Sequence, residues 1–193
     1  MGTPAAGTPA LAPQDTGIPG QAPPSPASQI AAALRRGDKA GALHLADDFL
    51  AGHPRDAQIR FLRAVVLGDL GRADEATAML EALTEDFPEL AEPYNNLAVI
   101  RAGQGNFAAA EHLLQQAISA QPGYVTAREN LGDLYITLAT DTYARAARLS
   151  PDSASLRRKL AQVRELGARL GSARTSATAS PATASAPAPA PAH

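Results

Sequence analysis

Residues 88–122 read PELAEPYNNLAVIRAGQGNFAAAEHLLQQAISAQP, and this stretch decides the fold. It runs from one proline to another, and Pro54 precedes the first of them by the same interval. Small residues keep the same period, with glycines at Gly37, Gly71 and Gly105 and alanines at Ala42, Ala76 and Ala110. A regular period with fixed punctuation, here about 34 residues long, is typical of stacked helical repeats.

Each punctuating residue has a physical role in a helical hairpin. The glycine ends the first helix, because a residue without Cβ adopts positive φ at little cost. The alanine lies where the second helix crosses the first closely, and the proline ends the second helix because it cannot continue the hydrogen-bond ladder. Apolar residues between them recur at helical spacing, as in Phe61, Leu62, Val65 and Val66. The pattern predicts an all-α solenoid of two-helix units.

Two of these units carry a family signature. The third has Tyr94, Leu97, Ala98, Ala110, Leu114 and Pro122, and the fourth has Leu131, Gly132 and Tyr135. In these positions the chain resembles the tetratricopeptide repeat family over roughly residues 25–151. It departs from the family where Arg101 replaces the usual tyrosine, and where the first two units lack the aromatic and leucine opening. The resemblance implies a right-handed solenoid of helix-turn-helix repeats, of bacterial origin, that binds proteins or peptides.

The expected domain organisation follows from the repeat and from composition. Both ends are built from Pro, Ala, Gly, Ser and Thr, which bury too little apolar surface to order a backbone. We expect disordered tails at 1–24 and 171–193, repeats at 25–54, 55–88, 89–122 and 123–151, and a capping helix at 152–170.

The fourth unit is shorter than the others. The interval from Pro122 to Pro151 falls five positions short of the earlier proline intervals, and neither Gly nor Pro lies between Gly132 and Pro151. Because the turn between the two helices is what is missing, we predict one helix over 126–149 in place of a hairpin. After it, Asp152 or Ser153 is expected to cap a last helix that ends at Gly171. The apolar stripe of that helix is expected at Leu156, Leu160, Val163, Leu166 and Leu170.

Several classes of function are disfavoured. The formal charge of −2 is unlike that of a nucleic-acid binder, and no apolar run is long enough to span a membrane. The chain has no Cys, and its four histidines show no metal-ligand spacing. No nucleophile with a paired base, phosphate loop or cofactor motif is present. We expect no catalytic residue, no cofactor and no metal, and therefore no enzyme.

The resemblance implies a binding groove lined by the first helices of successive units. The residues implied are Phe61, Val65 and Asp69 in the second unit, Glu92, Asn95, Asn96 and Val99 in the third, and Thr126, Glu129, Asn130 and Asp133 in the fourth. Asparagine amides can pair with the main chain of a peptide, because they offer both a donor and an acceptor. The alternative is that these asparagines hydrogen-bond within the helix stack or face water.

The charged residues of the implied groove limit the class of partner that we expect. The family members that bind a C-terminal carboxylate carry Lys and Arg in the groove, and this chain does not, so we expect no carboxylate-clamp ligand. Residues 56–122 hold ten acidic and four basic side chains, which favours a neutral to basic partner. We expect a scaffold that binds a peptide or protein segment. The alternative is a self-assembling, dimeric structural protein that uses the helix 126–149. The compartment is left open between periplasm, if a leader was removed, and cytoplasm.

Overall fold

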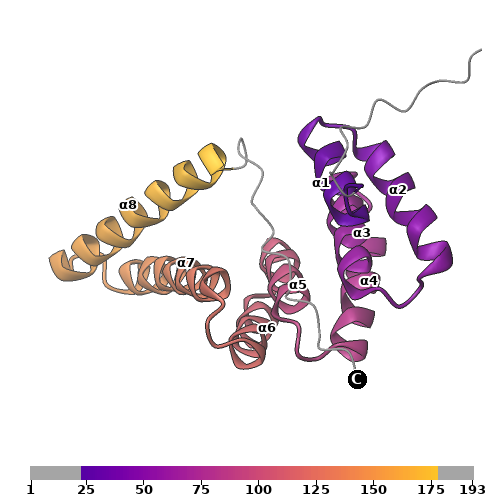
Figure 1. Ribbon diagram of the computed structural model, residues 1–193. Helices are drawn as coiled ribbons and strands as arrows, with labels where there is room; N and C mark the ends of the chain where they lie inside the picture. Colours follow the sequence, from indigo (N-terminus) through magenta and orange to yellow (C-terminus); the bar gives the residue numbers. More distant parts are fainter. Residues whose placement is uncertain (1–22, 178–193) are drawn as a thin grey trace, which may run out of the picture.

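The computed structural model describes residues 23–177, with side chains described to residue 170. Over this range all regular structure is helical, and each of the eight helices packs against the next along the chain (Figure 1). Their bounds are α1 Pro26–Arg35, α2 Lys39–Gly52, α3 Ala57–Asp69, α4 Ala73–Asp86, α5 Ala91–Gly103, α6 Phe107–Ala120, α7 Val125–Leu149 and α8 Ala154–Ala177. The expected tails, 1–24 and 171–193, lie outside the described residues except for 23–24 and 171–177.

Three hairpins have the predicted turns. Gly37, Gly71 and Gly105 have φ of 77°, 77° and 76°, in the left-handed region that favours glycine. The amide after each glycine donates to the carbonyl five residues earlier, at 2.9–3.0 Å. This hydrogen bond closes the helix end, so α1–α2, α3–α4 and α5–α6 each form a tight pair.

The core lies between the helices of neighbouring pairs. Ala42, Ala76 and Ala110 are at most 1 % exposed, which confirms that the second helices cross their neighbours there without room for larger side chains. One cluster joins α1, α2 and α3, a second joins α3, α4 and α5, and a third joins α5, α6 and α7. Each cluster includes residues of the next pair, so the units form one continuous stack.

The fourth unit is a single helix, as its missing turn predicts. The 25 residues of α7 run without a break from Val125 to Leu149, and α8 packs back against α7 (Figure 1). Ser153 caps α8 by accepting a hydrogen bond from the Leu156 amide at 3.3 Å. Neither helix is long and apolar enough to cross a membrane, and the same holds for the other helices in residues 23–177.

Two expectations for the last helix are wrong. α8 continues past Gly171 to Ala177, because Gly171 is itself helical and does not adopt the positive φ that ended the earlier helices. Helix-favouring Ala173 follows it. Leu166 is 46 % exposed, so it does not belong to the stripe that faces α7. Gly167 takes that place, and a Cβ there would lie 3.8 Å from Cγ2 of Ile136 on α7.

Candidate functional site

The residues implied for the groove lie on α3, α5 and α7, the first helices of the second, third and fourth units. The exposed ones are Asp69, Val99, Thr126 and Glu129, the half-buried ones are Phe61, Val65, Glu92, Asn96, Asn130 and Asp133, and Asn95 is buried. α5 packs directly against α7, which brings the residues of these two helices together. Phe61 contributes to the cluster that contains Leu97 of α5, so its ring has a core role.

Two of the asparagines bind each other. Nδ2 of Asn130 on α7 donates to Oδ1 of Asn95 on α5 at 2.7 Å, and Asn95 is only 4 % exposed. This is the helix-stacking role that the sequence left open as the alternative. The hydrogen bond joins the third and fourth units, and its burial leaves Asn96 as the more accessible amide on α5.

The residues implied for the groove include one exposed apolar side chain and several carboxylates. Val99 is 53 % exposed on α5, which is high for a valine in a helix of a packed stack. Asp69, Glu92 and Glu129 take part in none of the ion pairs of the described residues. Burial and, to a lesser degree, the nearby Glu92 carboxylate raise the pKa of Tyr124, the residue before α7. The residues implied for the groove thus include an exposed valine and three carboxylates that form no ion pair within the described residues.

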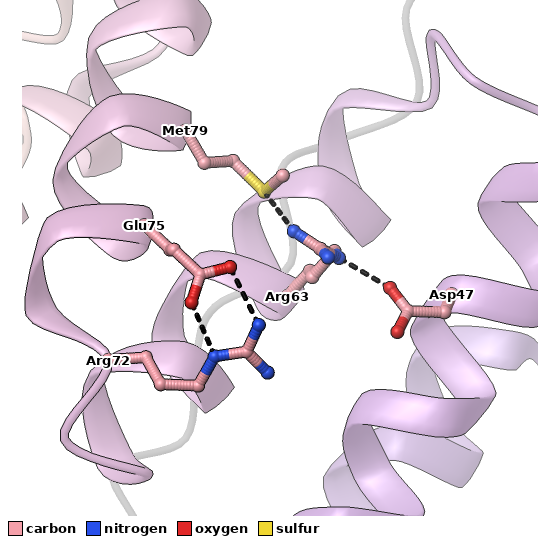
Figure 2. A network of polar contacts seen from close by, with 5 residues as sticks. All are labelled: Asp47, Arg63, Arg72, Glu75 and Met79. Carbon is pink, nitrogen blue, oxygen red and sulfur yellow. Dashed lines mark hydrogen bonds and ion pairs between the residues drawn. The ribbon is translucent and has the colours of Figure 1, made fainter.

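The cations of α3 and α5 point to other helices. Arg60 pairs with Asp86 at 2.6 Å, Arg63 with Asp47 at 2.5 Å, and Arg101 with Glu81 at 2.7 Å. All three acids lie on α2 or α4, the second helices of their units. Figure 2 shows Arg63 held between Asp47 and Met79. These three arginines therefore pair with the second helices of the units and not with the carboxylates implied for the groove.

Two hollows lie outside this face. One of about 430 Å³ is bounded by α4, α5 and α6, and its walls include Glu81, Leu97 and Leu113. Another of about 650 Å³ lies between the turn at Gly105, α7 and α8. The first hollow was not predicted from the sequence, although comparing equivalent positions of successive repeats gives a signal for it. Position 97 is the equivalent of Arg63, and a leucine there leaves space that an arginine fills one unit earlier.

Three histidines lie within the described residues, and all three are on the surface. His44, His53 and His112 are exposed. His44 lies 3.3 Å from Asp48, and the ring of His53 stacks on Phe49 with centroids 4.3 Å apart. In residues 23–177, no group of three or more His, Asp or Glu side chains is arranged to hold a metal ion.

Comparison with known proteins supports the repeat. A family model described as a tetratricopeptide repeat matches residues 29–91, 65–125 and 95–140, which together span more than half of the chain. No curated protein sequence matches the chain.

Solved structures share the fold. YrrB, described as a TPR protein with an unusual peptide-binding site, is 25 % identical with a TM-score of 0.50. The match covers 54 % of this chain and 54 % of YrrB, so the chain spans about half of that protein's length. MamA is 20 % identical with a TM-score of 0.51, covering 70 % of this chain and 82 % of MamA. A tetratricopeptide repeat protein from Parabacteroides merdae is 18 % identical with a TM-score of 0.53, covering 80 % of this chain and 62 % of its own.

Proposed function

The chain belongs to the tetratricopeptide repeat family, and we propose that it is a non-enzymatic scaffold that holds a peptide or protein segment against α3, α5 and α7. The contact residues are those named above for these helices, with Val99 at the centre and Asp69, Glu92, Glu129 and Asp133 around it. Asn95 contributes by fixing α5 against α7.

Two observations carry this proposal: Val99 is exposed, and Glu92 and Glu129 form no ion pair in the described part of the chain. An exposed apolar side chain gains by burial against a partner, and the acids attract cationic groups. Peptide binding by YrrB, a structural relative, agrees with this role. The acidic face favours a neutral to basic segment and disfavours a ligand held by its C-terminal carboxylate.

The proposal is tested by reversing the charge of two acidic residues of the proposed groove. The same charge reversal at two acidic residues outside the groove is the control. The probes are two fluorescent peptide pools of equal length and apolar content, one rich in lysine and one rich in glutamate. We expect the wild-type chain to bind the lysine pool at least ten-fold more tightly, and binding to weaken as salt screens the charges.

The double variant Glu92→Lys/Glu129→Lys should lose that preference. The matched control, Glu85→Lys/Glu89→Lys, makes the same charge change on α4 and the turn after it and should keep it. Equal binding of both pools by the wild-type chain contradicts the proposal. Equal loss in both double variants would show only a general effect of net charge, which also contradicts it.

Self-assembly is supported as a second candidate by a different observation. Leu149 at the end of α7 is 86 % exposed, and α8 has no buried residue over 154–170. A second copy of the chain would cover apolar surface that α8 leaves open. Analytical ultracentrifugation separates the candidates: we expect a concentration-dependent dimer that Leu149→Glu abolishes, and a monomer at high concentration removes this candidate.

A further inference from the structure

The solenoid has two equivalent clefts on the side of its second helices, one filled and one open. In the first cleft, α2 and α4 flank α3. In the second cleft, α4 and α6 flank α5 around the 430 Å³ hollow. The repeat period pairs Asp47 with Glu81, Arg63 with Leu97, and Met79 with Leu113. The two clefts therefore differ at identifiable positions.

The side chain of Arg63 fills the first cleft. Its Nε donates to Oδ1 of Asp47 at 2.5 Å, and its guanidinium lies 3.8 Å from the sulfur of Met79 (Figure 2). Only 21 % of the arginine side chain is exposed. The aliphatic stem thus lies on an apolar floor while the charged head reaches an acid at the rim, as arginine side chains commonly do.

The second cleft keeps the acid and the floor, but Leu97 stands at the position of Arg63, and the arginine that lines this hollow is Arg101. Leu97 is 3 % exposed and too short to reach the rim, so the space above it and Leu113 stays open. Glu81 at the rim is half exposed, and Arg101 contacts its Oε1 at 2.7 Å from the side of α5. A carboxylate has acceptor sites on both oxygens, so Glu81 can accept a second cation. The volume falls within the range of small-ligand sites, roughly 300–1,000 Å³.

We propose that the second cleft receives an arginine or lysine side chain of a protein partner, in the place that Arg63 fills in the first cleft. Glu81 binds the cationic head, and Leu97 and Leu113 bind the aliphatic stem. The internal arginine shows which chemistry this cleft geometry accommodates. The site lies on the opposite side of the helices from Val99 and does not rest on the proposed groove.

The test uses a short peptide with one arginine between alanines, and the same peptide with neutral citrulline in place of the arginine. Methyl resonances of Leu97 and Leu113 in isotope-labelled protein report binding at this cleft, because both residues line it. We expect the arginine peptide to shift both methyls in a saturable way, with at least five-fold tighter binding than the citrulline peptide. Unmoved methyls, or equal binding of the two peptides, overturn the proposal. Equal binding of a leucine peptide also overturns it, because that outcome indicates an apolar occupant.

Two variants make the test specific. Glu81→Gln should bring the arginine peptide to the affinity of the citrulline peptide, whereas Glu85→Gln, one turn later on α4, should change nothing. Unchanged binding in Glu81→Gln overturns the role of that acid. Leu97→Arg/Leu113→Met places an arginine and a methionine at the positions of Arg63 and Met79, and it should abolish the peptide-induced shifts of the neighbouring methyls. If that variant does not fold, Glu81→Gln still decides the outcome, because Glu81 lies on the surface.

Discussion

The third and fourth units begin alike and end differently. In the third, α5 ends at Gly103, Gly105 takes a φ of 76°, and α6 returns along α5. In the fourth, α7 continues without a turn, and its Ala139 stands where the pattern of the third unit has Ala110. The segment absent from the fourth unit corresponds to Gly105–Ala109. A short glycine-containing segment, and not the helices on either side, therefore makes the reversal.

Without the turn, the second half of α7 packs against a different helix from the one that a regular repeat would provide. α6 packs on α5, whereas the second half of α7 packs on α8 (Figure 1). The 650 Å³ hollow beside the turn at Gly105 lies between that turn and these two helices. The first half of α7 still packs with α5 and α6 through Ala127 and Leu134, and the four α7 residues of the proposed groove lie in that half.

Restoring the missing segment should have the largest effect. Insertion of Gly-Asn-Phe-Ala-Ala between Leu138 and Ala139 copies Gly105–Ala109 and returns the proline spacing to that of the other units. We expect α7 to split into a hairpin, which backbone chemical shifts would report as a loss of helix at the inserted glycine. An all-alanine insert of the same length is the control and should lengthen the helix, since alanine is the best helix former. Unbroken helical shifts in the first variant would show that the segment does not make the turn.

The contact between the two units depends on the asparagine pair. Asn130→Ala leaves the buried Oδ1 of Asn95 without this donor, and we expect a loss of about 1–3 kcal/mol of unfolding free energy. Urea denaturation measures it. Asn95→Ala/Asn130→Ala should cost less than the sum of the two single changes, because no unpaired amide remains. Additive costs would mean that the hydrogen bond does not couple the units.

Substitution of alanine at two glycines should change the stability of the protein in opposite directions. Gly105→Ala places a side chain at positive φ and should lower stability by about 1–2 kcal/mol. Gly132→Ala, inside α7 with open space around it, should raise stability by about 0.5–1 kcal/mol. Thermal unfolding of both variants gives the comparison, and a shift of the same sign in both would contradict it.

The smallest expected effect concerns the start of α4, where the second unit differs from the first and the third. Asp38 and Asn106 cap α2 and α6 with their side chains, whereas Arg72 at the equivalent position forms a two-bond pair with Glu75 at 2.6 Å (Figure 2). This hydrogen bond lowers the pKa of Glu75 below 4.5. The stabilisation is therefore present above pH 4.5 and lost as pH falls through the lowered pKa. Carboxyl NMR titration should show the Glu75 midpoint rising in Arg72→Gln and staying lowered in Arg60→Gln.

Much of this fold was predictable because its signals are local. The turn glycines, the small alanines and the shortened fourth unit can each be read from spacing along the chain. The end of α8 was not predictable. A glycine ends a helix only where the backbone takes positive φ, and the sequence around Gly171 does not indicate whether this glycine has a positive or a helical φ. The burial of Asn95 and the hollow over Leu97 depend on which neighbouring helix each side chain meets, and that is set by packing between units.

The two-helix hairpins end with α6, and α7 is one continuous helix that carries the last four residues of the proposed groove. The sequence has no Cys, so spin labels at Thr126→Cys and Arg148→Cys attach nowhere else. Both positions are exposed. A continuous helix predicts a separation of about 33 Å between them, from about 1.5 Å per residue. A hairpin of helices about 8–10 Å apart would bring the labels within roughly 20 Å, which would show that α7 is not one continuous helix.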